Sequence, residues 1–315
     1  MPLSYCNPIY DAYFADPFVL ATDEGYVAVG TGRIVDGLVF EVLGSEDLVS
    51  WHRVGGALEP VAAELGNDYW APEIAAADGR WWLYYSVGHD DTRHHLRVAV
   101  GDAPTGPYRD CGVNLTPDER FAIDPHPFRD RDGTWYLFHA RDVLDAERVG
   151  TMMAVDVLDG MSQLAGRPET VLRPSGDWQL FKRQREMYGG VYDWHTLEGP
   201  TVREHEGRYY CFYSGGNWQT DGYGVSYAVA DHPLGPWVES PAALAEGPLL
   251  RTVPGHVLGP GHNSVVTTPE GLDVMVYHAW DPGQTARRMC LDRLEWTTRG
   301  PVVHGPTWTP QTLTP

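Results

Sequence analysis

The feature of this sequence that most constrains its fold is a segment that occurs five times: a glycine followed by a short run of aromatic and β-branched residues. Runs of this kind, bounded by Gly, Pro and Asp, are typical of β-strands, and no window keeps the 3.6-residue apolar period of a helix. A unit that recurs at this length forms one structural module per copy. The copies start at Gly25, Gly79, Gly133, Gly207 and Gly271.

The spacing of the copies predicts a β-propeller. Successive glycines are 54, 54, 74 and 64 residues apart, which gives each copy room for three or four strands. Propellers are built from four-stranded blades around a central channel, and five such blades fit a chain of 315 residues. We therefore expect an all-β protein, a five-bladed β-propeller in which residues 1–315 form a single domain.

The residue nine positions before each glycine defines a candidate site. In a propeller the first strand of each blade lines the axis, so residues at one register meet at one mouth of the channel. Converging carboxylates repel one another, which is costly unless they serve catalysis or a metal, and their pKa values are forced apart. The five positions are Asp16, Trp70, Asp124, Glu198 and His262.

Carboxylates of unequal pKa suit the hydrolysis of a glycosidic bond. One protonated carboxylic acid serves the leaving oxygen, while an ionised carboxylate acts on the other face of the sugar. In the inverting reaction the two groups stand ~6.5–9.5 Å apart, which opposite sides of a channel mouth can supply. A third carboxylate keeps the pKa of the acid raised by repulsion. Trp70 offers a flat apolar face for the sugar ring.

Each of these residues also has a structural interpretation. Asp-Pro pairs are common at turns, and Glu198 precedes Gly-Pro, which is also typical of a turn. Trp70 could belong to the core, and His262 could be hydrogen-bonded in the channel without any metal. The shared nine-residue spacing favours the functional interpretation for the carboxylates.

Five groups of short motifs surround the candidate residues, one group in each repeat. They are FADPFV at 14–19, YWAPEI at 69–74, IDPHPF at 123–128, EGP at 198–200, and GHNS at 261–264 with YHA at 277–279. Together and in this order they resemble family 43 of the glycoside hydrolases, over nearly the whole chain. The resemblance implies a five-bladed propeller with inverting chemistry.

The resemblance also implies roles for the three carboxylates. Asp16 corresponds to the general base that activates water, and Glu198 to the general acid. Asp124 corresponds to the residue that adjusts the pKa of the acid and helps to orient it.

Two further site residues follow from the same resemblance. His262 resembles a histidine near the channel axis, commonly beside a calcium or sodium ion that is held mostly through waters. Such an ion would be structural, since the chemistry requires no cofactor. Arg287 resembles an arginine that reaches the substrate ring, although Arg288 is an adjacent alternative.

The longest interval between candidate residues, from Asp124 to Glu198, carries an aromatic insertion. Long loops in compact folds are usually functional. We expect Trp194 or His195 to lie near the substrate; alternatively, these aromatics cover the edge of a blade. Glu73 could contact substrate or make a structural hydrogen bond.

The charge and the cysteines exclude several kinds of partner. A net charge of −20 repels phosphate backbones and anionic lipids, so we expect no nucleic acid and no membrane partner. The first residues lack the basic and apolar segments of a secretory signal, which predicts a cytoplasmic protein. The four cysteines lack metal-ligand spacing, and we expect free thiols at Cys6, Cys111, Cys211 and Cys290.

The resemblance supplies the substrate class, which is plant cell-wall pentose sugars in oligosaccharides. Its members divide among α-L-arabinofuranosidases, β-xylosidases and arabinanases. We expect an exo-acting α-L-arabinofuranosidase. Many of the xylosidases carry an additional C-terminal β-sandwich domain, for which a chain of 315 residues has no room beside the propeller. The alternatives are a β-xylosidase, a bifunctional enzyme or an endo-arabinanase. A non-catalytic sugar-binding propeller is disfavoured because all three carboxylates are present. The oligomeric state is left open.

Overall fold

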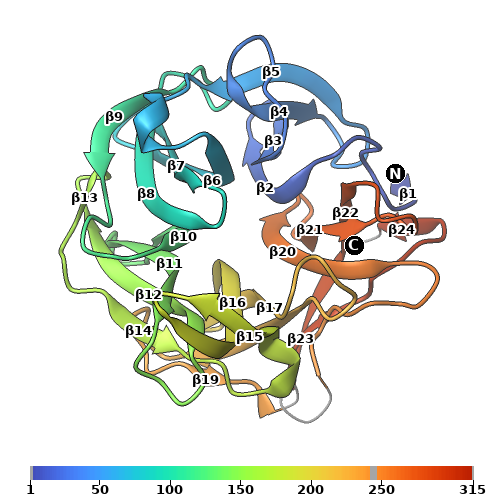
Figure 1. Ribbon diagram of the computed structural model, residues 1–315. Coiled ribbons are helices and arrows are strands. Elements are labelled where there is room, and N and C mark those ends of the chain that lie inside the picture. Colours follow the sequence, from blue (N-terminus) through green and yellow to red (C-terminus); the bar gives the residue numbers. More distant parts are fainter. Residues whose placement is uncertain (1–2, 242–246, 314–315) are drawn as a thin grey trace.

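The computed structural model describes residues 3–241 and 247–313, and its strands form a ring of antiparallel sheets around a central axis (Figure 1). Three of the sheets have four strands each. They consist of β2 (Ala15–Thr22), β3 (Gly25–Thr31), β4 (Val39–Ser45) and β5 (His52–Leu58); of β6 (Asp68–Ala77), β7 (Arg80–His89), β8 (Thr92–Gly101) and β9 (Arg109–Asn114); and of β20 (Leu258–Thr267), β21 (Asp273–Trp280), β22 (Arg287–Thr297) and β23 (Gly300–Val303).

A ten-stranded sheet contains two further antiparallel groups. The first has β10 (Ala122–Arg129), β11 (Trp135–Val143) and β12 (Gly150–Asp159), with β13 (Gln163–Leu164) and β14 (Glu169–Leu172) paired to β12. The second has β16 (Gly190–His205), β17 (Arg208–Gly215), β18 (Gly224–Ala230) and β19 (Val238–Glu239). A short parallel pairing of β12 with β16 joins the two groups. The strands β2, β6, β10, β16 and β20 thus each stand first in the strand order of one group, and the division into five blades stays a prediction.

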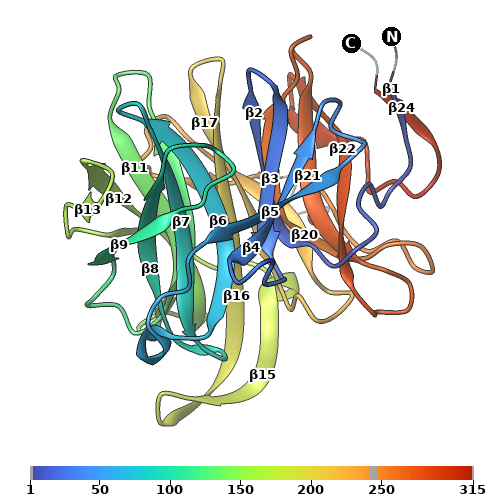
Figure 2. The same ribbon diagram turned by 90° about the horizontal axis from the view of Figure 1, so that it is seen from above.

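The chain ends meet beside the last sheet. β1 (Leu3–Tyr5) pairs with β24 (Gln311–Leu313), and Figure 2 shows this pair of strands beside β22. The Asn7 side chain donates to the Leu291 carbonyl at 2.8 Å and accepts from the Leu291 N–H at 2.9 Å. These contacts tie the N-terminal segment to the strand β22, so the first and last parts of the chain close the ring together.

The core lies between neighbouring sheets. One apolar cluster contains Val29 and Phe40 of the first sheet together with Ile74 and Tyr85 of the second. Each sheet therefore buries both of its faces, which explains why its inner strands are almost continuously apolar. The all-β propeller class is confirmed, and the four cysteines are free as predicted.

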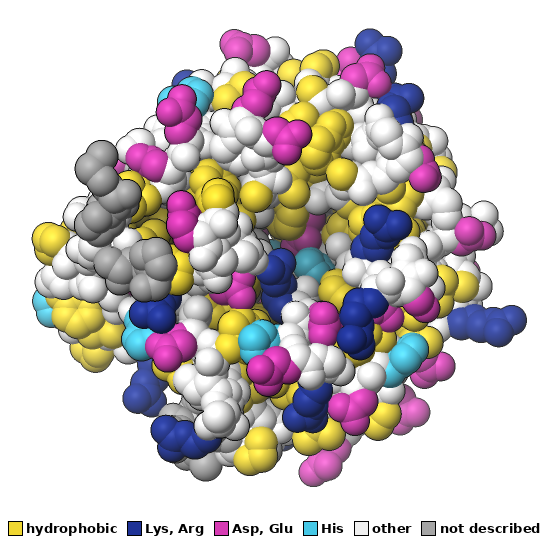
Figure 3. Space-filling model, turned by 180° about the vertical axis from the view of Figure 1, so that it is seen from behind, with side chains coloured by type: hydrophobic (Ala, Val, Ile, Leu, Met, Phe, Trp, Pro, Cys, Tyr) yellow, Lys and Arg dark blue, Asp and Glu magenta, His cyan; other side chains and the backbone are white. Residues whose placement is uncertain are grey.

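The two ends of the channel differ. On one face, β15 (Leu180–Met187) and the first half of β16 form a hairpin that projects beyond the other loops (Figure 2). Figure 3 shows the opposite face, hollowed at its centre, where a pocket of about 490 Å³ is lined in part by Arg129, Arg203 and Glu204. Two short 3-10 helices, η1 (Ala63–Leu65) and η2 (Asp177–Gln179), precede β6 and β15. In the described part of the chain, no helix has the length and apolar character needed to cross a membrane.

Candidate active site

A β-bulge interrupts each of the five innermost strands, and it positions the candidate site. In every bulge one residue has a positive φ, between 47° and 59°. These residues are Asp16, Ala71, Asp124, Gly199 and His262. Such backbone is rare for residues other than glycine and is often found at functional sites.

The bulges correct the nine-residue spacing. It is right for Asp16, Asp124 and His262, but Trp70 and Glu198 lie one position before the bulged residue in their strands. The turn between the first two strands differs in length among the repeats, so counting from the glycine shifts the register. In the fourth repeat the bulged residue is Gly199, where a Cβ atom would come within 3.1–3.3 Å of the His262 ring. The glycine therefore leaves the room that this histidine occupies.

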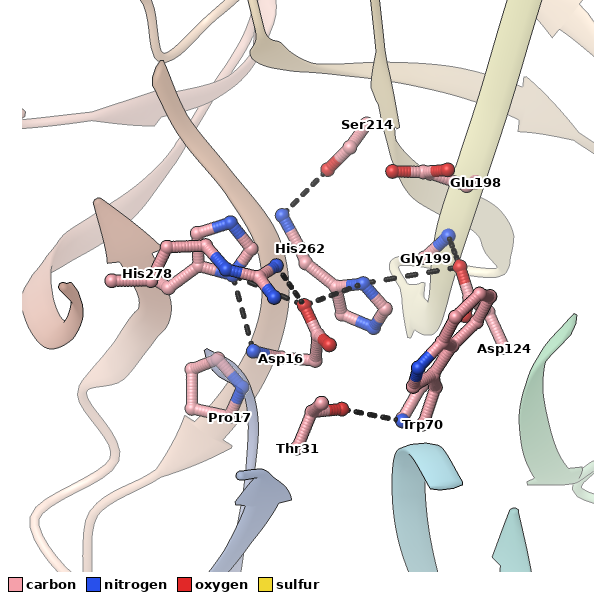
Figure 4. Close-up of polar contacts among 12 residues, drawn as sticks. Asp16, Pro17, Thr31, Trp70, Asp124, Glu198, Gly199, Ser214, His262 and His278 are labelled. Carbon is pink, nitrogen blue, oxygen red and sulfur yellow. Dashed lines mark hydrogen bonds and ion pairs between the residues drawn. The ribbon is translucent and has the colours of Figure 1, made fainter. Parts of the chain in front are cut away.

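Asp16 lies in a buried, cationic environment (Figure 4). Its Oδ1 atom is 3.2 Å from Arg287 Nη1 and 3.4 Å from His262 Nδ1, and its N–H donates to His278 Nδ1 at 3.1 Å. Burial acts to raise the pKa of Asp16, but His262, Arg287 and His278 outweigh it and hold this pKa well below its ordinary value. Burial lowers the pKa of His262 and of His278, which disfavours the charged form of both rings. Arg287 is therefore the neighbour of Asp16 that stays positively charged.

Asp124 and Glu198 lie in the opposite kind of environment. Burial and the charges of Glu198 and Asp16 raise the pKa of Asp124 well above its ordinary value, although the Gly199 N–H donates to its Oδ2 at 2.9 Å. Burial, together with the charge of Asp16, raises the pKa of Glu198 to about 7, against a hydrogen bond from Tyr223 at 2.6 Å. Glu198 is the more exposed of the two, so it can hold a proton where a ligand could reach it.

His262 lies at the axis but does not complete a protein-made metal cage. Its Nδ1 faces Asp16 at 3.4 Å and Asp124 at 3.8 Å, and its N–H donates to Ser214 Oγ at 2.7 Å. Calcium prefers six to eight oxygen ligands. Within residues 3–241 and 247–313, no group of three or more His, Cys, Asp or Glu side chains is suited to hold a metal. A calcium cage of protein oxygens therefore does not fit here, and the ion expected beside His262 stays a prediction.

Arg287, not Arg288, reaches the site. Besides Asp16, its guanidinium donates to the Tyr13 hydroxyl at 2.7 Å and stands 4.4 Å from the centre of the Trp218 ring. Arg288 points away, into ion pairs with Asp11 at 2.7 Å and Asp281 at 3.2 Å. Neighbouring residues on a strand face opposite sides, which explains the separation.

An aromatic wall stands beside this arginine. The rings of Trp218 and Trp280 are stacked at 6.1 Å, and Trp280 Nε1 donates to the Trp218 carbonyl at 2.7 Å. Trp70 contributes on the far side, close to Asp124 (Figure 4), but one of its faces is stacked on His94 at 3.6 Å. A sugar could therefore meet only the other face or the edge of Trp70.

The structure does not support a sugar contact by Trp194. This ring is completely buried, and its Nε1 donates to Thr151 Oγ1 at 3.2 Å. His195 is also buried: its Nδ1 donates to the Asp193 carbonyl at 3.1 Å, and its Nε2 accepts from Arg148 at 3.0 Å. Through these contacts both residues anchor the projecting hairpin. Such anchoring is needed because an isolated two-stranded hairpin is only marginally stable in water.

Glu73 makes a structural hydrogen bond. The Val202 N–H donates to His126 Nε2 at 3.0 Å, so His126 carries its proton on Nδ1 and donates it to Glu73 Oε2 at 2.7 Å. Together these two bonds link the second, third and fourth innermost strands around the channel. The alternative of a substrate contact for Glu73 is therefore not supported.

Sequence reasoning missed two residues that contact the carboxylates. Tyr223 donates to Glu198 Oε1, and its ring lies parallel to that of His278, which contacts Asp16. His278 lies in the YHA motif, so a signal for it was present, whereas Tyr223 lies in an irregular segment without any register. The sequence carries an indirect signal for Tyr223 at Gly261, where a Cβ atom would collide with the Tyr223 ring.

The channel mouth of this propeller brings a carboxyl group of lowered pKa, Asp16, together with one of raised pKa, Glu198, and this is the kind of pair that hydrolysis of a glycosidic bond requires. The sequence model described as "Glycosyl hydrolases family 43" matches residues 5–302, and the chain belongs to this family. It is thus a glycoside hydrolase.

Two curated relatives cover most of the chain. It is 28% identical to the beta-D-galactofuranosidase xynD of Aspergillus niger, over 94% of this chain and 84% of that protein. It is 27% identical to alpha-L-arabinofuranosidase 43 of Humicola insolens, over 93% of this chain and 63% of that protein.

Solved structures agree with the fold. A crystal structure of a thermostable family-43 glycoside hydrolase is 31% identical, with a TM-score of 0.85 and coverage of 98% of both chains. The α-L-arabinofuranosidase of Lactobacillus brevis has a TM-score of 0.77 over 97% of this chain and 98% of that chain. At 20% identity, the second likeness supports the fold alone.

Proposed function

We propose that this enzyme releases terminal α-L-arabinofuranosyl units from oligosaccharides, with inversion at the anomeric carbon. The observation that carries the proposal is the contrast between Asp16, which is held ionised, and Glu198, which keeps its proton near neutral pH. An inverting glycosidase needs this pair of states. The curated arabinofuranosidase of Humicola insolens supports the choice of sugar.

Asp16 acts as the general base. Arg287 keeps its carboxylate ionised, so it can accept a proton from a water molecule that attacks the anomeric carbon. Its surroundings also favour this role over that of an acid, because a proton on Asp16 would weaken its ion pair with the guanidinium. Positive-φ backbone fixes the Asp16 carboxylate at the channel mouth.

Glu198 acts as the general acid and protonates the leaving oxygen. A pKa of about 7 keeps it largely protonated below neutral pH, yet allows it to release the proton readily. Asp124 is buried and accepts from the N–H of Gly199, the residue after Glu198, so it helps to orient the acid. Proton NMR of the first-formed sugar tests inversion: the released anomer should have the configuration opposite to that of the substrate.

A β-D-galactofuranosidase is the second candidate, favoured by the relative from Aspergillus niger. The rings of α-L-arabinofuranose and β-D-galactofuranose have the same arrangement of substituents, and galactofuranose carries one more CHOH group outside the ring. One catalytic geometry could therefore serve both sugars. The space around the exocyclic carbon would decide between them.

A panel of 4-nitrophenyl glycosides tests the proposal. We expect the highest kcat/KM on α-L-arabinofuranoside, a lower value on β-D-galactofuranoside and the lowest on β-D-xylopyranoside. Linear arabinan should yield monosaccharide from the first time points. A preference for xylopyranoside would contradict the choice of sugar, and early release of mixed oligosaccharides would contradict exo action.

A further inference from the structure

We propose that a pocket between the first two sheets binds the sugar unit next to the one that is released, and that Arg33 and Asn67 are its polar contacts. This inference rests on the proposed function, because an exo-acting enzyme leaves the rest of the oligosaccharide to be held beyond the scissile bond. The pocket has a volume of about 430 Å³, which lies in the range of small-ligand sites of ~300–1,000 Å³.

The pocket shares lining residues with the surroundings of the catalytic carboxylates. It is lined by Tyr13, which accepts a hydrogen bond from Arg287, and by Trp70, which lies beside Asp124. Thr31 also lines the pocket, and its Oγ1 accepts from the Ala71 N–H at 2.8 Å (Figure 4). An oligosaccharide whose terminal unit sits at the carboxylates could thus extend into this pocket without leaving the protein surface.

The projecting hairpin of β15 and β16 occupies the side of the channel mouth opposite this pocket (Figure 1). The projecting hairpin is fixed to the second sheet by an ion pair of 2.7 Å between Arg185 and Asp91, which are 94 residues apart. It is fixed to the third group by a hydrogen bond from Tyr188 to Asp142 at 2.7 Å. The guanidinium of Arg185 also lies 5.1 Å from the centre of the buried Trp194 ring. The hairpin therefore forms a wall there, whereas the first two sheets leave a pocket.

The chemistry of the pocket suits a neutral sugar. Arg33 and Asn67 are exposed at its rim, and in the part of the chain that the structure describes neither side chain has a hydrogen-bond or ion-pair partner. Both carry N–H donors that can bind hydroxyl oxygens. Tyr13 and Trp70 add aromatic surface for the apolar face of a sugar ring. Ile34, which is 69% exposed, extends this apolar surface at the rim.

The test compares two substrates that share the released sugar. For Arg33→Ala and Asn67→Ala, kcat/KM on α-1,5-arabinotriose should fall by roughly fivefold to tenfold, as expected for one lost hydrogen bond. On 4-nitrophenyl α-L-arabinofuranoside, which has no second sugar, it should stay within twofold of the parent. Arg183→Ala is the matched control, because Arg183 pairs with Asp193 inside the projecting hairpin. It should change neither value.

Equal losses on both substrates, or no loss on either, would overturn the pocket proposal. Calorimetric titration of arabinotriose into the Asp16→Asn protein, with and without Arg33→Ala, separates this result from failure of the proposed function. Weaker binding of the trisaccharide but not of arabinose in the double variant supports the pocket whatever the turnover, and equal binding overturns it. Failure of the parent enzyme on arabinosides concerns the proposed function alone.

Discussion

Asp16 and Asp124 occupy equivalent bulges in the first and third innermost strands, yet their carboxyl groups behave oppositely. Both precede a proline and have nearly the same φ, 50° and 59°. Arg287 is 3.2 Å from Asp16, whereas the charge with the largest effect on Asp124 is that of another carboxylate, Glu198. The backbone therefore sets where each carboxylate lies, and the neighbours on adjacent strands set whether it carries a proton.

The most severe test of this contrast removes the charge of the first aspartate. Asp16→Asn should reduce kcat on every substrate by on the order of 10²- to 10⁴-fold, the usual contribution of a general base. The asparagine keeps the size of the side chain, so thermal unfolding should show a folded protein. Near-normal turnover with a normal melting curve would mean that Asp16 is not the base.

Removing the positive charge of Arg287 should raise the pKa of Asp16, so that Asp16 becomes more like Asp124 in its protonation. In Arg287→Met the pKa of Asp16 should rise, because Arg287 is its permanent positive neighbour. Since the base works only when ionised, the acidic limb of kcat/KM against pH should move to higher pH. A rise of about two pKa units would lower kcat/KM by roughly 10²-fold at pH values below the shifted limb, because each unit changes the ionised fraction about tenfold.

The matched control for that change is Arg288→Met, which removes an adjacent arginine whose ion pairs face away from the site. Its acidic limb should stay in place. If the two variants had the same profile, the assignment of Arg287 as the partner of Asp16 would be wrong.

The pKa of the general acid, Glu198, can be changed through Tyr223. Glu198 must be protonated to act, so kcat/KM of the parent should decline as the pH rises through about 7. The hydrogen bond from Tyr223 favours the ionised form of Glu198. Tyr223→Phe should therefore raise the pKa of Glu198 and move the basic limb upward by about one pH unit, the size expected for one hydrogen bond to a charged group.

For Tyr223, the control is Tyr213→Phe, another buried tyrosine whose hydroxyl donates to Glu239 instead. That variant should leave the basic limb unchanged. A downward shift in Tyr223→Phe would contradict the proposed role of its hydroxyl.

The smallest effect on activity is expected away from both aspartates. Trp194→Phe should lower the free energy of unfolding by about 1–3 kcal/mol, because it leaves a small cavity and removes the hydrogen bond from the indole N–H to Thr151, whose hydroxyl still donates to Asp142. The values of kcat and KM should stay within twofold of the parent. A marked rise in KM without loss of stability would restore Trp194 as a substrate contact.

The sequence was informative where strand register and side-chain chemistry coincide. Asp16 and Asp124 could be paired because each begins an Asp-Pro bulge, and aligning on the proline also reveals that Ala71 and Gly199 are the matching positions. Counting from the glycines missed this because turn lengths vary. The choice between Arg287 and Arg288 depends on which side of β22 faces the axis, which needs the pairing of that strand.

The remaining parts of the site depend on packing. Trp194 and Trp218 are both tryptophans in irregular or inserted segments, yet one is buried under the hairpin and the other stands beside Arg287. Composition does not distinguish these cases, because only tertiary contacts decide which face of a ring is covered. Tyr223 could not be predicted for the same reason.

The central claim, that Asp16 is the base and Glu198 the acid, is tested most directly by varying the leaving group. Rates of Glu198→Gln and Asp16→Asn should be measured on aryl arabinofuranosides whose phenols range from strongly to weakly acidic. Acidic phenols leave without protonation, so Glu198→Gln should be nearly as fast as the parent on them and much slower on weakly acidic ones. Asp16→Asn should be slow on all of them. A uniform loss in Glu198→Gln, or a loss in Asp16→Asn that depends on the phenol, would contradict the account.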